Sequence, residues 1–249
     1  MIIDCHCHAI KGDEMTNPWN METYLGKYLK RSAMAGISRT VLFAMFHQDY
    51  AVANRQVASI IANNPGRFYG FAFVNSSSDR GRIGKLIEEA VVKYGFCGIK
   101  AHRHDSRITR EVCDVARDFS LTVLYDIDNE VSVIDFLAVE YPDISFIIPH
   151  LGSFLDNMKA QTEIIPRLMQ YPNIYTDTSG VRHFNLLLEA VQKAGAEKIL
   201  FGTDGPWLHP GLELMKIRAI QLQKSDENLI LGENFLRLVA RTRAKLGNF

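Results

Sequence analysis

The chain has 249 residues, and 28 Lys and Arg are balanced by 28 Asp and Glu, so the formal net charge is zero. Its length suits one large domain or two small ones, and 47% hydrophobic with 22% charged residues is typical of a globular protein, which excludes a disordered chain. No apolar run approaches the roughly 20 residues that cross a bilayer, and no cluster of Lys and Arg forms the surface that nucleic acid needs. We therefore expect neither a membrane nor a nucleic acid as partner.

The N-terminal residues and the cysteines favour a cytoplasmic protein. Polar and ionisable side chains begin at Asp4, where a secretory signal would need a basic start and a long apolar stretch. The four cysteines (Cys5, Cys7, Cys97 and Cys113) are too few for a disulfide scaffold and lack C-x-x-C spacing, so we expect free thiols.

Eight short β-branched or aromatic runs that stop at polar residues predict strands. In chain order they span residues 2–8, 40–46, 68–74, 98–102, 121–126, 145–150, 173–177 and 198–204. Segments with helical periodicity lie between them, at residues 50–63, 81–93, 109–119, 131–139, 154–169, 183–193 and 212–223. Prolines or glycines at the helix-to-strand joints end several of these helices.

The repeating layout predicts a single-domain (β/α)8 TIM barrel over residues 1–249. Eight units average about 31 residues each, close to the spacing of a barrel of this size. A doubly wound open sheet is the alternative, but its first strand is usually followed by G-x-G-x-x-G, whereas residues 8–12 read His-Ala-Ile-Lys-Gly.

Ionisable side chains gather where the predicted strands end. The carboxyl ends of barrel strands carry the active site, because the loops after them converge on one face. These positions hold His6, His8, Lys100, His102, Asp126, His150, Asp177 and Asp204.

His6 and His8 are candidates for half of a metal site. Side chains alternate along a strand, so both imidazoles point to one side and can converge on one cation. Two structural histidines would explain this short motif equally well. His150 and Asp204, each at the mouth of a buried strand, make a shared site the better interpretation, since a carboxylate there can bind a metal or accept a proton from water.

Five segments together resemble the amidohydrolase superfamily, in its amidohydrolase-related branch of TIM-barrel metal-dependent hydrolases. They are Asp-Cys-His-Cys-His at 4–8, Gly-Ile-Lys-Ala-His at 98–102, His-Leu-Gly at 150–152, Gly-Thr-Asp-Gly-Pro at 202–206 and Ile-Leu-Gly-Glu-Asn-Phe at 230–235. The resemblance spans the chain in the correct order, and the first and fourth segments are its specific part.

The resemblance implies one divalent cation held by His6, His8 and Asp204. His150 would be a further ligand, or would polarise the substrate and water, and Asp204 would accept a proton. Zinc suits imidazole ligands best, with manganese or iron as alternatives. The implied reaction is hydrolysis of an amide, lactone or ester bond in a small molecule.

One position departs from the family pattern. Members usually have a histidine at the end of strand five, where this chain has Asp126. Asp126 is either a replacement metal ligand or a sign that the metal is weakly held or absent, as in related metal-free lactonases.

Other residues near the predicted mouth have two interpretations each. We expect Lys100 to pair with a neighbouring Asp or to contact substrate, and not to be carboxylated as in binuclear relatives. His102 and Arg103 are expected at the rim, where Arg103 would bind a substrate carboxylate. Asp177 is expected to cap the following helix, or else to orient a ligand histidine. Trp19 and Trp207 are candidates for an aromatic lid.

Three other functions remain as alternatives. Similar sites in the superfamily perform non-oxidative decarboxylation, and a non-catalytic barrel that binds a small molecule would also retain this pattern. A TatD-like nuclease is disfavoured, because residues 202–204 read Gly-Thr-Asp where a glutamate-rich motif is expected. The substrate and any assembly into homo-oligomers are left open.

Overall fold

Eight parallel strands form one sheet in which each strand pairs with the next along the chain. The structure is a computed structural model that describes residues 1–10, 25–154 and 157–246; Trp19 lies outside the described residues. The strands are β1 (Ile3–Ala9), β2 (Arg39–Ala44), β3 (Phe68–Phe73), β4 (Gly98–His102), β5 (Thr122–Asp126), β6 (Phe146–Ile148), β7 (Ile174–Asp177) and β8 (Ile199–Leu200).

Backbone contacts between β1 and the segment after β8 close the sheet. Cys5 N donates to Phe201 O at 2.9 Å and His8 N donates to Gly205 O at 2.7 Å. The predicted TIM barrel is therefore confirmed, and the open-sheet alternative is wrong.

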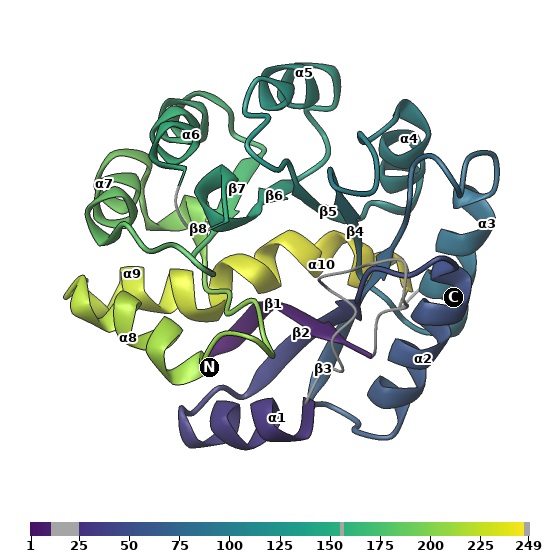
Figure 1. Ribbon diagram of the computed structural model, residues 1–249, viewed down its shortest axis with the longest axis horizontal. Coiled ribbons are helices and arrows are strands. Elements are labelled where there is room, and N and C mark those ends of the chain that lie inside the picture. The colour runs from purple at the N-terminus through teal and green to yellow at the C-terminus, as the bar shows by residue number, and fades with distance from the viewer. Residues whose placement is uncertain (11–24, 155–156, 247–249) are drawn as a thin grey trace.

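Helices surround the barrel (Figure 1). Those between the strands are α1 (Leu25–Met34), α2 (Tyr50–Ala62), α3 (Ile83–Glu88), α4 (Arg110–Phe119), α5 (Val133–Glu140), α6 (Met158–Gln170) and α7 (Phe184–Ala194). After β8 come α8 (Pro210–Ala219), α9 (Lys224–Asn228) and α10 (Asn234–Leu246). Strands covered on both faces need apolar residues on both faces, which explains the continuous hydrophobic runs in the sequence.

Two predicted strands, 145–150 and 198–204, are shorter than expected. His150, Leu151 and Asp204 have φ angles of 59°, 51° and 51°. This left-handed conformation is incompatible with a strand and is uncommon outside glycine. The chain therefore turns sharply where it presents His150 and Asp204.

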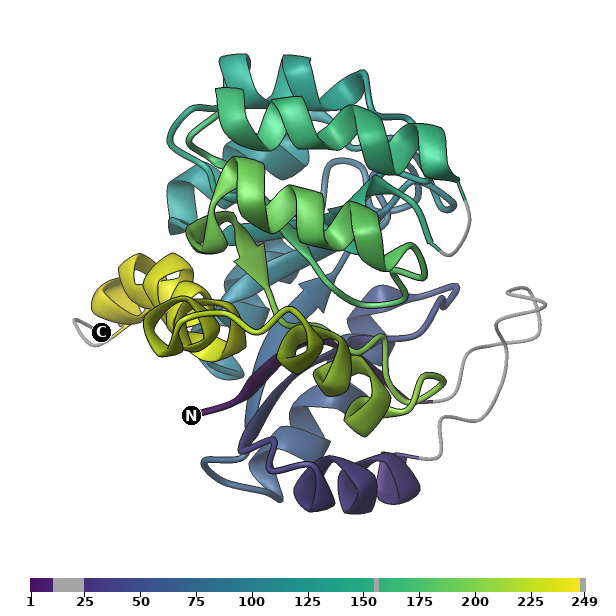
Figure 2. The same cartoon turned by 90° about the vertical axis from the view of Figure 1, so that its left-hand side faces the viewer.

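Helices α1, α9 and α10 were not predicted, and α10 covers the amino-terminal end of the barrel. The ring of Phe235 lies 6.2 Å from that of Phe71, and Thr122 Oγ1 donates to Leu238 O at 3.1 Å. Figure 2 shows α10 beside the N-terminus of the chain. This end is therefore closed by packing.

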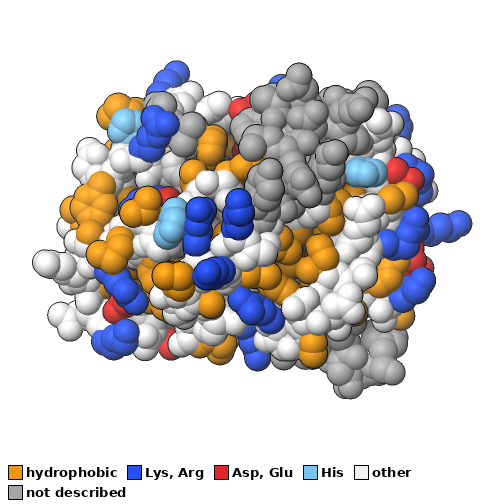
Figure 3. Space-filling model, turned by 60° about the horizontal axis from the view of Figure 1, so that its bottom comes forward, with side chains coloured by type: hydrophobic (Ala, Val, Ile, Leu, Met, Phe, Trp, Pro, Cys, Tyr) orange, Lys and Arg blue, Asp and Glu red, His pale blue; other side chains and the backbone are white. Residues whose placement is uncertain are grey.

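The outer helices expose some apolar side chains among basic ones, as the face in Figure 3 shows. Met34 on α1 and Leu212 and Met215 on α8 are exposed hydrophobic residues. Among the described residues, no helix has the length and apolar character of a membrane span.

Candidate metal centre and active site

A pocket of about 250 Å³ opens at the carboxyl ends of the strands. It contains all but one of the predicted site residues, since Arg103 does not line it. Its walls are formed by His6, His8, Phe46, Lys100, His102, His104, Asp126, Asp128, His150, Phe154, Asp204 and Trp207.

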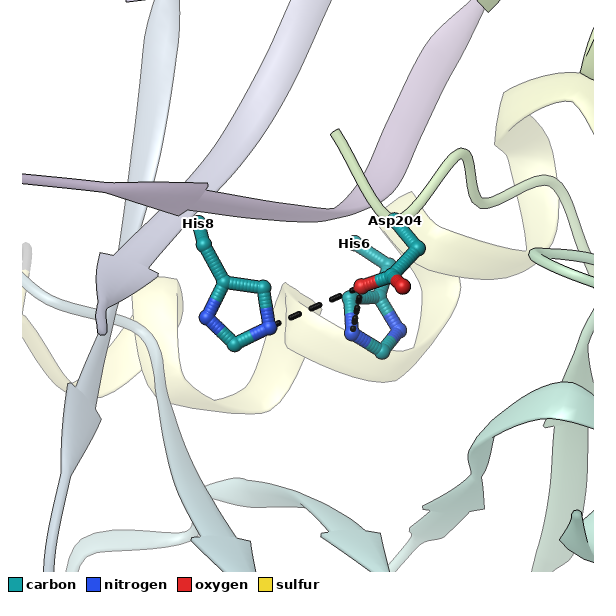
Figure 4. Close-up of side chains that lie close together, drawn as sticks. All are labelled: His6, His8 and Asp204. Atoms are coloured by element: carbon teal, nitrogen blue, oxygen red, sulfur yellow. Dashed lines mark ion pairs between the residues drawn. The ribbon is translucent and has the colours of Figure 1, made fainter. Parts of the chain in front are cut away.

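His6 and His8 turn their rings toward Asp204 (Figure 4). The Nε2 atoms of His6 and His8 lie 3.3 and 3.6 Å from Asp204 Oδ1. The histidines come from β1 and the aspartate from the sharp turn after β8, so closure of the barrel brings them together.

The other ring nitrogen of each histidine shows where its proton is. His8 Nδ1 lies 2.9 Å from Ala44 O, and a carbonyl oxygen only accepts, so Nδ1 donates. His6 Nδ1 donates likewise to Asp177 Oδ2 at 2.8 Å. Burial lowers the pKa of His6, and that of His8 well below its usual value, which favours neutral rings. In a neutral ring Nε2 then carries a lone pair directed at Asp204.

These three atoms fit a metal ion. Two lone pairs and a carboxylate oxygen repel one another unless a cation lies between them. Tetrahedral ligands at roughly 2.0 to 2.2 Å from an ion stand about 3.3 to 3.6 Å apart, which matches the observed separations. The donor set of two imidazoles and one carboxylate is compatible with zinc, manganese or iron.

Asp177 orients His6 and the turn that carries His150. Its Oδ1 accepts from His150 N at 3.2 Å and from Ser179 N at 3.0 Å, and Oδ2 accepts from His6. Burial disfavours the charge of Asp177, but the contacts with His6 and His150 hold its pKa below the usual value. The expectation that Asp177 caps the next helix is wrong, because α7 begins at Phe184 with His183 at the cap position.

His150 differs from the other two histidines in what faces its Nε2 atom. Its Nδ1 donates to Ser179 O at 2.7 Å, while Nε2 lies 3.5 Å from Asp126 Oδ2. Burial disfavours protonation of His150, yet the contact with Asp126 and the nearby carboxylates raise its pKa to about 9. A protonated His150 donates through both nitrogens and has no lone pair for a metal.

Asp126 lies between two histidines. His102 Nδ1 accepts from His104 N at 2.9 Å, so its Nε2 donates to Asp126 Oδ2 across 3.2 Å. Burial opposes ionisation of Asp126, but His102 and His150 hold its pKa well below the usual range.

The two predicted cationic substrate contacts lie in different surroundings. Lys100 is fully buried at the pocket, and its Nζ has no hydrogen-bond partner among the described residues, so the expected direct contact with a neighbouring Asp is not formed. The charges of Asp126, Asp204 and Asp177 still act on it, but burial outweighs them and lowers its pKa. Arg103 Nε donates to Glu130 Oε2 at 2.8 Å and lines a shallower cavity at the rim.

Ser179 and Asp4 support the site and were missed in the sequence. Ser179 Oγ donates to Asp177 Oδ1 at 2.5 Å and lies 2.9 Å from His150 Nδ1. The only sequence signal was its position two residues after Asp177. Asp4 is completely buried. Its sequence signal was its position as the first residue of the Asp-Cys-His-Cys-His motif, in which only the histidines were assigned a role.

The aromatic walls were also only partly predicted. Trp207, a candidate lid residue, does line the pocket, with its ring 4.9 Å from that of His8. Phe46 and Phe154 were missed, because isolated aromatic residues in loops look alike in the sequence. Gly180, with φ of 63°, leaves the space that Phe154 occupies: a Cβ atom there would lie 2.8 Å from its ring.

Comparison with known families and curated proteins gave one family match. Residues 129–240 match the model of a family described as amidohydrolase. No curated protein matches the chain in sequence.

Solved structures share the fold at low identity. The 5-carboxyvanillate decarboxylase of Sphingomonas paucimobilis is 15% identical, covers 96% of this chain and 98% of its own, and has a TM-score of 0.76. A dihydroxybenzoic acid decarboxylase of Polaromonas sp. JS666, with bound manganese and 2-nitroresorcinol, is 18% identical over 100% of this chain and 99% of its own, with a TM-score of 0.71. A Pseudomonas putida protein assigned as a 2-pyrone-4,6-dicarboxylic acid hydrolase is 15% identical over 96% and 97%, with a TM-score of 0.74.

Proposed function

We propose that the chain is a member of the amidohydrolase superfamily of TIM-barrel proteins, whose family model matches residues 129–240, and that it is a metal-dependent hydrolase of a small molecule. The observation that carries the proposal is the convergence of His6 Nε2, His8 Nε2 and Asp204 Oδ1 at the pocket. A barrel that only binds a small molecule does not require two imidazole nitrogens and a carboxylate oxygen to face one another. The bond cleaved is that of an amide, a lactone or another ester.

His6, His8 and Asp204 would hold one divalent cation, most suitably zinc. When bound, the cation supplies a Lewis acid and makes hydroxide available near neutral pH. Asp177 and the carbonyl of Ala44 keep the two rings in the required tautomer, a role typical of groups behind metal ligands.

Asp204 and His150 would move the protons. Asp204 contacts the histidines through Oδ1, and we assign Oδ2 as the acceptor of the proton from the attacking water. The oxygen of that water forms the new bond to the carbonyl carbon, and the bond to the leaving nitrogen or oxygen breaks. His150 Nε2, opposite Asp126, donates its proton to the leaving group, and the proton on Asp204 then passes through solvent to His150, so that one water is consumed and both residues are restored.

We assign Asp126 as an orienting residue for His102 and His150. Its Oδ2 already faces both histidines, whereas the carboxylate that faces His6 and His8 is Asp204. An acid at the end of β5 thus keeps His150 protonated, a task that a neutral histidine would not perform. Direct ligation by Asp126 predicts, instead, that Asp126→Ala releases the metal.

Decarboxylation is the second candidate. His150 could protonate the carbon that loses carbon dioxide, and two of the similar folds are named decarboxylases. Both reactions would use the same pocket, so the products must distinguish them.

The test combines metal analysis with product analysis. The purified protein is loaded with zinc or manganese and assayed with lactones, N-acyl compounds and hydroxybenzoates in H₂¹⁸O. Hydrolysis incorporates ¹⁸O into the product, whereas decarboxylation releases carbon dioxide without it. We expect Asp204→Asn to lower kcat at least about 100-fold. Asp114→Asn, at an exposed position on α4, is the matched control. A chain that binds no metal, or an Asp204→Asn variant with full activity, would refute the proposal.

A further inference from the structure

Lys100 is a buried cation without an acceptor. It lies on β4 at the pocket, is 0% exposed, and its Nζ makes no hydrogen bond with the described residues. Nζ lies 5.1 Å from the centre of the Phe43 ring, but a ring face does not satisfy three N–H donors. A buried charge that is left unpaired is costly, so it needs a specific reason.

Charge balance supplies only part of that reason. Burial lowers the pKa of Lys100, and the nearby carboxylates Asp126, Asp204 and Asp177 oppose this only partly. Each of these carboxylates is also engaged elsewhere. Asp126 faces His102 and His150, as described above. Asp177 accepts from His6 and Ser179, and Asp204 faces the two histidines of β1. None of them accepts a hydrogen bond from Lys100 Nζ, which has no partner among the described residues.

The surroundings of Lys100 place it close to the candidate metal centre. The centre of the Phe43 ring lies 4.6 Å from that of His8, 5.2 Å from that of His6 and 5.1 Å from Lys100 Nζ. An anion bound to Lys100 would therefore occupy the same pocket as His6, His8 and Asp204. Phe46 and Phe154 offer apolar walls for the rest of the molecule.

We propose that Lys100 is the receptor for a substrate carboxylate, and that the substrate is a small acid whose carboxylate lies next to the reacting bond. A single ammonium group with free N–H donors suits one carboxylate. The volume of about 250 Å³ lies below the roughly 300 to 1,000 Å³ of common ligand pockets, which favours a compact molecule. This inference rests on the proposed function for the reaction, but the recognition of an acid can be tested without turnover.

The test compares acids with their uncharged amides. Isothermal titration calorimetry is performed with benzoate and benzamide, 2-furoate and 2-furamide, and cyclohexanecarboxylate and its amide, on zinc-loaded and metal-free protein. We expect at least one acid to bind at least 10-fold more tightly than its amide. Lys100→Met should remove that preference, whereas Lys100→Arg should retain most of it. Lys85→Met, at an exposed position on α3, is the matched control.

Stability provides an independent readout. If Lys100 binds substrate, Lys100→Met should unfold at the same or a higher temperature than the wild type without ligand, because an unpaired buried charge is removed. If Lys100 only balanced charge, the same change would lower the unfolding temperature. Lys100→Gln, which keeps a donor without the charge, serves if the Met variant does not fold.

The two proposals fail in different ways. Acid preference in no pair, or a preference that persists in Lys100→Met and Lys100→Gln, would overturn the carboxylate receptor even in an active metalloenzyme. Loss of acid preference in those variants supports the receptor even if the protein binds no zinc, in which case only the proposed hydrolysis fails.

Discussion

Replacement of Asp4 is expected to weaken metal binding at the candidate centre, although Asp4 is not itself a candidate ligand. Asp4 Oδ1 accepts from His6 N at 3.1 Å and from Thr203 N at 2.9 Å. Its Oδ2 accepts from Thr203 Oγ1 at 2.7 Å and from the hydroxyl of Tyr28 in α1. The side chain therefore fastens the strand that carries His6 to the turn that carries Asp204.

The size of the effect follows from the donors that lose their acceptor. In Asp4→Ala the two hydroxyls can rotate toward other partners, but the backbone N–H groups of His6 and Thr203 cannot. Each buried donor left unsatisfied costs about 1 to 3 kcal/mol, so we expect the free energy of unfolding to fall by about 2 to 6 kcal/mol. Asp4→Asn keeps an oxygen for both N–H groups. Because burial raises the pKa of Asp4 to about 7, a neutral side chain is already tolerated there, and we expect a loss of only about 1 kcal/mol or less.

The assay is guanidinium unfolding of the metal-free variants together with zinc affinity by competition with a chelator. Asp4→Ala should weaken zinc binding at least 10-fold, because His6 and Asp204 are no longer held in register, and Asp4→Asn should stay close to the wild type. Asp114→Ala, at an exposed site, controls for the loss of a carboxylate. An Asp4→Ala variant with unchanged stability and zinc affinity would refute the reasoning.

Three further predictions concern the histidines and Gly180. His6→Ala and His8→Ala should each lose the bound metal in elemental analysis, while His209→Ala, at the exposed cap of α8, should retain it; metal retained by both barrel variants would contradict the site. In metal-free protein, His150 has a folded-state pKa of about 9 against an ordinary 6.5, so its stabilisation is complete below about pH 6.5 and is lost as the pH rises through 9. This difference corresponds to about 3 kcal/mol in urea unfolding, and His150→Gln should lack this decline; equal pH profiles would argue against a protonated His150. Gly180→Ala should lower the unfolding temperature and displace Phe154, whereas Gly84→Ala within α3, where a Cβ meets only a methyl group at 3.9 Å, should not.

The barrel could be predicted because its strands are short, apolar and regularly spaced. The predicted range 98–102 coincides with β4, and most other strands agree within two residues at each end. The predicted strands 145–150 and 198–204 were too long, because the chain after β6 and β8 adopts left-handed φ angles at His150 and Asp204. Such angles are uncommon outside glycine and occur often at functional sites, so strand propensity does not reveal them. Helix α10 was not predicted because it follows the eighth strand and its helix, and a pattern of eight strand–helix units does not require a further helix.

The residues of the candidate site could be predicted by type and position, but their interactions could not. His6 and Asp204 were expected to meet because both lie at strand ends of one barrel. In contrast, Arg103 and Lys100 looked like equivalent substrate contacts, and only the fold shows that Glu130 engages the arginine while the lysine has no acceptor among the described residues. Such partners lie 27 residues apart for Arg103 and Glu130, and no local pattern links them.

The different roles we assign to the histidines arise from their neighbours and not from the residue type. His8 and His150 both donate Nδ1 to a backbone carbonyl, so both direct Nε2 into the pocket. The Nε2 of His8 meets Asp204 together with a second neutral imidazole, and three electron-pair donors in one place favour a cation. The Nε2 of His150 faces Asp126, and a proton on Nε2 is enough to make the contact between imidazole and carboxylate favourable. Asp126 at the end of β5 therefore gives His150 a different role from His8: we assign His8 to metal binding and His150 to proton transfer. A pocket that contains both residues can activate water for attack on a bond and protonate the leaving group.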